Sequence, residues 1–316
     1  MSFPLQRAGR AVFAGSLITA GLATAANAQN IGYGVTANGT LFRFNPASTA
    51  TATTIGNLGI LPEAIDFRPG TATLYAIDVG PVTTQLYTVN TGTGFITPVG
   101  AGFPTTVVGA GAYDLSGAQT FGFDFNPRTL QGDGSVRIRL VSSGTDANLR
   151  LNSNTGLVAA VDTALNPGSP FVDASAYTNS GQSTAGGATS LFGLDSIIDD
   201  LVLQNLPNDG TITSVGSFGV SIDANPNTAF DILSTNVADD TIADELAFAA
   251  FTRTATSGGA YLLYDVNLTT GETTNGRLVG GGLEFTGGLA VIPEPSTLAA
   301  LGLVGMMSLK RRRRAQ

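Results

Sequence analysis

A short strand pattern that ends in asparagine recurs along this chain and constrains its fold more than any other feature. In four copies a turn and a glycine follow the asparagine: Leu86–Asn90 with Gly94, Leu149–Asn152 with Gly156, Leu201–Asn205 with Gly210, and Leu262–Asn267 with Gly271. A fifth copy, Leu41–Asn45, lacks the glycine. Asn and Gly tolerate positive φ, and Asn can bond its own backbone, as a hairpin requires. Each copy therefore predicts a hairpin in one repeating unit.

Two further series of strands complete the unit. Opening strands are predicted at 64–69, 121–127, 174–179, 229–233 and 283–287, and middle strands at 73–78, 136–142, 190–195 and 245–252. The last opening strand has no hairpin after it, while the first hairpin has no opening strand before it, so the two complete one another. Four strands recur about every 50 residues, which is typical of a propeller.

We predict an all-β fold, a five-bladed β-propeller of four-stranded blades closed by a C-terminal strand. The blades are expected on residues 63–100, 119–165, 172–218, 228–280, and a composite of 281–292 with 31–58. No long segment keeps an apolar period of 3.6 residues, which disfavours helices. A two-sheet β-sandwich is the alternative, because strand counts alone do not exclude it.

Both ends of the chain read as targeting segments, so the predicted domain covers residues 29–292. Residues 1–28 have the features of a signal peptide: arginines precede an apolar run, and Ala26 and Ala28 form a small-x-small cleavage site. Residues 293–316 form a tail with Pro293-Glu294-Pro295, an uncharged stretch from Ser296 to Leu309, and a basic cluster. As a helix that stretch would extend roughly 21 Å, short of the roughly 30 Å bilayer core.

The tail resembles a PEP-CTERM sorting signal in its motif, its apolar segment and its cluster Lys310 to Arg314. The resemblance implies processing by an exosortase at the inner membrane, with only transient membrane association, and carriers that are exported by bacteria making extracellular polysaccharide. Signal peptidase is the expected partner at the other end. The product is expected in the cell envelope, at the cell surface or outside the cell.

Composition excludes several classes of function. The chain has no histidine, cysteine or tryptophan, so zinc held by His or Cys, histidine-based catalytic triads and disulfides are excluded. Without both targeting segments, eight basic residues remain against twenty-two acidic ones, a net charge near −14. Such a surface repels phosphates, so nucleic acid is not an expected partner.

The body resembles a family of secreted bacterial domains with no assigned function. The resemblance rests on residues 121–127, 148–152, 176–179 and 207–216 and extends over most of residues 31–280. It implies no activity, cofactor or catalytic residue.

Carboxylates are the remaining source of chemistry. Aligning the opening strands places one residue of each blade at an equivalent position near the ring axis: Asp66, Asp124, Tyr177, Asp231 and Glu284. Such a ring could bind a cation or a polyhydroxylated ligand. Alternatively, the acids accept hydrogen bonds from neighbouring blades or pair with arginines such as Arg68, Arg137 and Arg139.

A second, calcium-binding hypothesis concerns the loop that carries Asp239, Asp240, Asp244 and Glu245, although it lacks EF-hand spacing.

These observations favour an exported non-enzymatic protein of the envelope or extracellular matrix that binds a glycan or another surface component. No cofactor is required, with calcium as the one candidate. The alternative is a polysaccharide hydrolase or lyase that uses two carboxylates, since paired acids can cleave sugar linkages.

Overall fold

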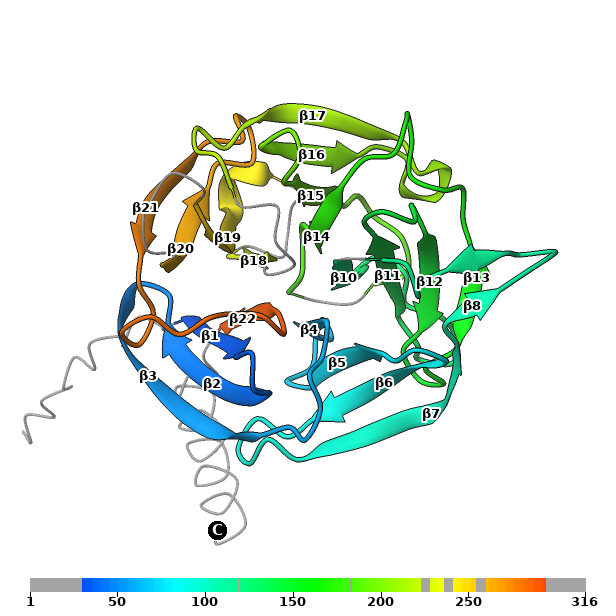
Figure 1. Cartoon of the computed structure of the whole chain (residues 1–316), viewed down its shortest axis with the longest axis horizontal. Coiled ribbons are helices and arrows are strands. Elements are labelled where there is room, and N and C mark those ends of the chain that lie inside the picture. The colour runs from blue at the N-terminus through cyan, green and yellow to red at the C-terminus, as the bar shows by residue number, and fades with distance from the viewer. Residues whose placement is uncertain are drawn as a thin grey trace, which may run out of the picture.

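The structure is a computed structural model that describes residues 30–118, 120–181, 184–222, 228–235, 241–253 and 260–293. Five antiparallel four-stranded sheets are arranged around a central axis (Figure 1). The predicted five-bladed β-propeller is confirmed, and the sandwich alternative is wrong. Within the described residues, no helix is long and apolar enough to cross a membrane.

Each blade runs from an inner strand at the axis to an outer strand at the rim. In order from axis to rim, the blades are: blade 1, β22 (Leu289–Pro293), β1 (Asn30–Val35), β2 (Thr40–Asn45), β3 (Ser48–Asn57); blade 2, β4 (Ala64–Phe67), β5 (Leu74–Val79), β6 (Thr83–Val89), β7 (Ile96–Pro104); blade 3, β10 (Phe121–Phe125), β11 (Arg137–Ser142), β12 (Asn148–Asn152), β13 (Val158–Val161); blade 4, β14 (Val172–Tyr177), β15 (Leu191–Asp195), β16 (Asp200–Gln204), β17 (Ile212–Ser217); blade 5, β18 (Ala229–Ser234), β19 (Glu245–Thr252), β20 (Tyr261–Val266), β21 (Thr273–Arg277).

Four short elements lie outside the four-stranded sheets. The strands β8 (Thr106–Val107) and β9 (Tyr113–Asp114) form a hairpin between blades 2 and 3, and two 3-10 turns, η1 (Pro207–Asp209) and η2 (Ile242–Asp244), lie in loops of blades 4 and 5.

Ring closure follows the predicted scheme, but with a different strand. The closing strand is β22, which pairs with β1 so that Asn30 lies opposite Pro293, whereas a strand was predicted at 283–287. That segment was predicted as the last of the series of opening strands, but Phe285 packs edge-on against Phe42 and Phe44 of β2 from the irregular segment before β22. The chain becomes extended only after Gly288, whose φ is +101°.

The glycine of each repeat makes the contact between neighbouring blades. A Cβ on Gly271 of blade 5 would lie 2.1 Å from the carbonyl oxygen of Gly216 in blade 4, and one on Gly156 of blade 3 would lie 2.3 Å from that of Val99 in blade 2. The hairpin that lacks the glycine, in blade 1, is held differently: the Arg277 guanidinium of blade 5 donates to the Pro46 carbonyl at 3.0 Å and pairs with Asp265 at 2.6 Å.

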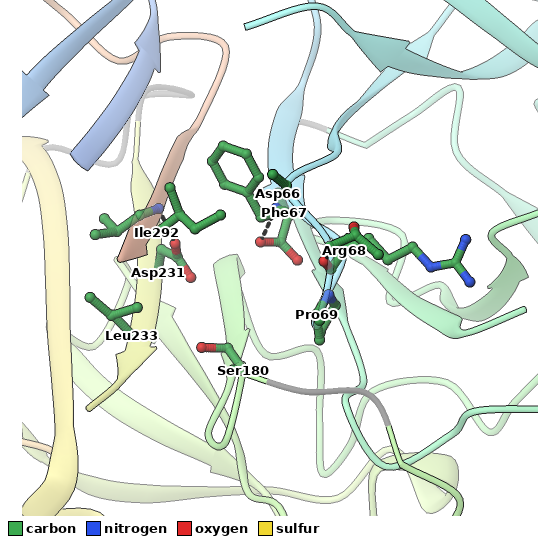
Figure 2. A pocket seen from close by; sticks show the side chains of 13 residues that line it. Asp66, Phe67, Arg68, Pro69, Ser180, Asp231, Leu233 and Ile292 are labelled. Atoms are coloured by element: carbon green, nitrogen blue, oxygen red, sulfur yellow. Dashed lines mark hydrogen bonds between the residues drawn. The ribbon is translucent and has the colours of Figure 1, made fainter. Parts of the chain in front are cut away.

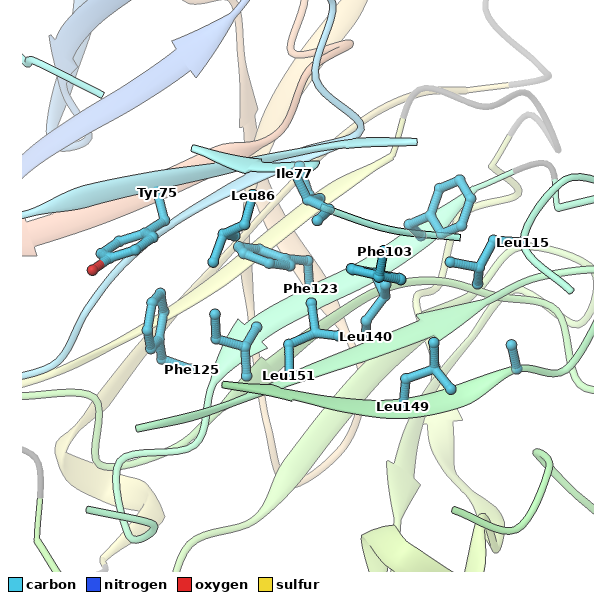
Figure 3. Packing of buried hydrophobic residues seen from close by; sticks show 14 of the residues in the cluster. Tyr75, Ile77, Leu86, Phe103, Leu115, Phe123, Phe125, Leu140, Leu149 and Leu151 are labelled. Atoms are coloured by element: carbon cyan, nitrogen blue, oxygen red, sulfur yellow. The ribbon is translucent and has the colours of Figure 1, made fainter. Parts of the chain in front are cut away.

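Apolar side chains fill the spaces between blades. Figure 3 shows one such cluster, in which Tyr75 and Leu86 of blade 2 pack against Phe123, Phe125 and Leu140 of blade 3. Similar clusters separate blades 4 and 5 and blades 5 and 1. The inner strands surround the axis, with polar groups toward their C-terminal ends and apolar side chains toward their N-terminal ends.

Candidate functional site

The five inner strands surround the axis in the order β22, β4, β10, β14, β18, and each contacts the next around the ring. Strand register defines the equivalent residue in every blade, which we call the axial position. The residue two positions before the repeat asparagine lies in the third strand of its blade and pairs with a residue of the second strand. That second-strand residue pairs in turn with one residue of the inner strand, which is the axial position. The five axial positions are occupied by Ala290, Asp66, Asp124, Ala176 and Asp231.

The structure therefore corrects two of the five predicted positions. In blade 4 the axial position is Ala176, and Tyr177 is the next residue, so its side chain leaves the opposite face of the strand. The Tyr177 ring is buried, and its hydroxyl lies 3.4 Å from Nε of Arg139 in blade 3. Tyr177 contributes its backbone amide to the axis rather than its side chain.

In blade 1 the axial position is Ala290. Glu284 is exposed and lies in the loop before β22, beside Thr36 and Asn38 on the surface. It does not join the other acids, because the predicted strand that placed it there is a turn.

The three remaining acids converge. One carboxylate oxygen from each of Asp66, Asp124 and Asp231 lies within 4.8 Å of the others. The three residues are between 3% and 7% exposed. We call this group the axial triad.

Backbone amides hold the triad in place. Asp66 accepts from the amides of Phe67 at 2.6 Å and of Phe125, in the next blade, at 2.8 Å. Asp231 likewise accepts from Ile232 at 2.7 Å and from Val291 of the next blade.

Asp124 accepts from the amide of Tyr177 in blade 4. In every blade, then, the amide that follows the axial position is bonded to a triad carboxylate. The predicted hydrogen bonding between neighbouring blades is confirmed, and it satisfies donors that the inner strand edges would otherwise bury unpaired.

No cationic side chain balances the triad within the described part of the chain. The guanidinium of Arg68 instead donates to Asn154 and to the Gly134 carbonyl, that of Arg137 to Ser135, and that of Arg139 to Asp162 at 2.6 Å. The predicted pairing of axial acids with arginines is therefore wrong. Arg68 joins loops of blades 2 and 3, and Arg137 makes a contact within blade 3. Arg139 makes contacts within blade 3 and with blade 4.

Burial and mutual repulsion favour the protonated forms. Burial, followed by the charge of Asp231, raises the pKa of Asp66 well above its usual range, and burial with the charges of Asp66 and Asp231 does the same for Asp124. Burial raises the pKa of Asp231 to about 7 although two amides bond to it. At neutral pH the triad therefore holds protons unless a cation replaces them.

Two members of the triad, Asp66 and Asp231, line a pocket at one end of the axis. A pocket of about 350 Å³ lies beyond the C-terminal ends of the inner strands, with Asp66, Asp231, Arg68 and Ser180 among its lining residues. Figure 2 shows the carboxylates of Asp66 and Asp231 facing the same space from opposite sides, while the Arg68 side chain extends away from them. We call this opening the axial mouth.

The opposite end of the axis is nearly filled. Phe121, Phe123 and Phe230 line a space of about 10 Å³ there, together with the hydroxyl of Ser175, which has no hydrogen-bond partner. A ligand of the triad would thus enter by the axial mouth.

The donor set suits a hard divalent cation. Calcium takes six to eight oxygen ligands at roughly 2.3–2.6 Å, and carboxylates, hydroxyls and water supply them. Each triad oxygen bonded to an amide retains a second lone-pair direction. Asp66, Asp124 and Asp231 can therefore be the protein ligands of one calcium ion, with the pocket side left for other oxygens.

The second predicted calcium site is described only in part. Asp239 and Asp240 lie outside the described residues. Asp244 ends η2, and the Glu245 carboxylate accepts from Ser234 at 2.8 Å and from the amide of Asn179 in blade 4 at 2.9 Å. Glu245 thus makes a contact between blades, and calcium binding by this loop stays a prediction.

The targeting residues are likewise beyond most of the description. Pro293 is the last residue of β22, while Glu294, Pro295, Ala26 and Ala28 lie outside the described residues. The predicted signal cleavage and the position of the domain boundaries therefore stay predictions.

Comparison with solved structures gives only remote likenesses. A protein from Lactobacillus plantarum is 13% identical, with a TM-score of 0.41, and the match covers 84% of this chain and 99% of the other. A protein of unknown function from Bacteroides caccae is 9% identical, with a TM-score of 0.41 and coverage of 84% and 99%. Likenesses this weak carry no argument about function. Among curated proteins, no match was found.

Comparison with protein families is specific and confirms both sequence resemblances. The PEP-CTERM protein-sorting motif matches residues 291–314, so the protein is exported and sorted to the cell surface by an exosortase system. The family described as "Domain of unknown function (DUF4394)" matches residues 40–289, nearly the whole propeller. This chain belongs to the DUF4394 family.

Proposed function

We propose that this protein is a non-enzymatic binding protein of the cell envelope, and that its axial mouth receives a glycan or another polyhydroxylated surface component. One observation carries the proposal: three buried carboxylates without a cationic partner lie together, and two of them, Asp66 and Asp231, line an open pocket. The sorting motif supplies the setting, because it delivers the protein to the cell surface, where a glycan is the proposed ligand.

Calcium is the proposed link between the triad and the ligand. Hydroxyl groups of a sugar are oxygen donors and can complete the coordination of a calcium ion that the protein holds from one side only. The triad leaves its pocket side free for such donors. The cation would also replace the protons that the buried carboxylates otherwise retain.

The geometry gives less support to the hydrolase or lyase. Carboxyl groups stand roughly 6.5–9.5 Å apart in inverting glycosidases and roughly 5–5.5 Å apart in retaining ones. The triad oxygens, within 4.8 Å of one another, are too close for the inverting arrangement, and a retaining enzyme needs one carboxylate free to act as the nucleophile. All three acids are also committed to backbone amides.

A binding screen tests the proposal. The fragment from Gln29 to Pro293 is titrated with matrix polysaccharides and a glycan panel, in calcium and in chelator. We expect binding in calcium that is lost in chelator and in Asp66→Asn and Asp231→Asn. Asp209→Asn, which changes an exposed acid of η1, is the matched control and should bind normally.

Binding that persists in both axial variants and in chelator would contradict the proposal. Release of reducing ends from the same polysaccharides would instead support the hydrolase. Circular dichroism of each variant separates lost binding from lost folding.

A further inference from the structure

The axial mouth and the sorting tail lie on the same face of the propeller. β22 is an inner strand, and its last residues, Val291 and Ile292, line the axial pocket. Pro293, where the strand ends, is the first residue of the Pro-Glu-Pro motif. The chain therefore leaves the domain at the rim of the mouth and continues directly into the tail.

The connection to the apolar stretch is short. Ser296, where the uncharged stretch begins, is three residues after Pro293, a reach of about 11 Å even when fully extended. Two prolines restrict that reach further, because each fixes φ. The headgroup layer on one side of a bilayer is itself roughly 5–8 Å thick. A propeller tethered in this way cannot move its mouth far from the membrane surface.

From this geometry we infer that the axial mouth faces the membrane while the tail is attached, and that removal of the tail opens the mouth to large ligands. The inference rests on the transient membrane association that the resemblance of the tail to a sorting signal implies. The partner surface is the lipid headgroup layer, and the short connection to the tail, rather than charge attraction, would hold the loops that follow the inner strands against it. Polysaccharide binding would then be confined to the processed protein.

Topology gives an internal control on the opposite face. The loop between β4 and β5, with the exposed Ala72, borders the mouth, whereas the turn between β5 and β6, with Val82 75% exposed, lies at the other end of the same blade. Because the chain has no cysteine, Ala72→Cys and Val82→Cys each introduce a single thiol.

Thiol labelling tests the inference. Each variant is prepared as the full tail-bearing chain in vesicles of phosphatidylethanolamine and phosphatidylglycerol, and as a chain ending at Pro293. Maleimide on a large polyethylene glycol should label Ala72→Cys several-fold more slowly in the vesicle-bound form than in the shortened form. Val82→Cys should label at the same rate in both, and a small maleimide should label both sites in both forms.

Two results would overturn the inference. Equal labelling of Ala72→Cys by the large reagent in both forms, on chains that float with the vesicles, would overturn it and leave the binding function untouched. Failure of the full chain to float would overturn both the inference and the membrane residence on which it rests. Glycan binding by the shortened chain is scored separately.

Discussion

At the scale of single residues, the axial triad joins the inner strands by accepting hydrogen bonds from their backbone amides. Asp66 and Asp231 each bond two backbone amides, and Asp124 bonds one. The axial alanines Ala290 and Ala176 have no side-chain acceptor. In the blade that follows each of them, the backbone amide after the axial position therefore donates to the aspartate of its own strand. Three carboxylates thus serve five strands, at the cost of burying three acids together.

That arrangement predicts an unusual pH dependence without divalent cations. An acid whose folded pKa is raised binds more protons folded than unfolded, so its stabilisation is complete below its unfolded pKa and is lost as pH rises through its folded pKa. For Asp231 this window runs from about 4 to about 7. We expect the free energy of unfolding in chelator to fall by a few kcal/mol across it.

Urea unfolding at a series of pH values measures this. The slope should be smaller in Asp231→Asn, which cannot titrate, than in the unmodified chain. Part of the slope should remain in that variant, because burial also raises the pKa of Asp173 to about 7. Stability that rises from pH 4 to pH 7 would contradict the account.

At the scale of elements, four of the five repeats join two blades through their glycine. Gly271 has φ +83° and no room for a Cβ, while Gly281 has φ +84° and nothing within 4 Å of a Cβ. Alanine at either position would be strained by the positive φ. Only at Gly271 would the Cβ also clash with the neighbouring blade.

Gly271→Ala should therefore destabilise the fold by more than about 2 kcal/mol, and Gly281→Ala by about 1 kcal/mol. Chemical unfolding of both variants provides the comparison. Equal losses would show that the turn conformation alone explains the repeat glycine.

The closing strand supports a second prediction at this scale. β22 supplies the inner strand of blade 1 and the Val291 amide that bonds Asp231. A chain ending at Gly288 should lose cooperative unfolding, because β1 is left with a bare inner edge and Asp231 without one donor. A chain ending at Pro293 should unfold cooperatively, and calorimetry distinguishes the two. Cooperative unfolding of the shorter chain would contradict this role for β22.

At the scale of the whole molecule, the repeats made the architecture predictable, while the site was predictable only in part. Asparagine and glycine mark hairpins locally, so blade number and ring closure follow from their count. Asp66, Asp124 and Asp231 were found because their strands align without gaps. Tyr177 and Glu284 were misplaced because the axial position depends on strand register, which a shift of one residue or an intervening turn changes without altering the residue pattern.

Hydrogen bonding of the axial acids by neighbouring blades was predicted, but no sequence pattern identifies the backbone amides that donate. Backbone donors look the same at every residue, and only the assembled ring brings the amide of one blade to the carboxylate of another. The axial mouth is likewise formed by loops of different blades.

Calcium titration of the chelator-treated fragment from Gln29 to Pro293 tests the central claim most directly. Calorimetry should give one calcium ion per chain, release of protons on binding at neutral pH, and no binding in the variant with Asp66, Asp124 and Asp231 all replaced by Asn. Asp209→Asn should bind as the unmodified chain does. Absence of binding in the unmodified chain, or equal binding in the folded triple variant, would contradict a cation site at the axis.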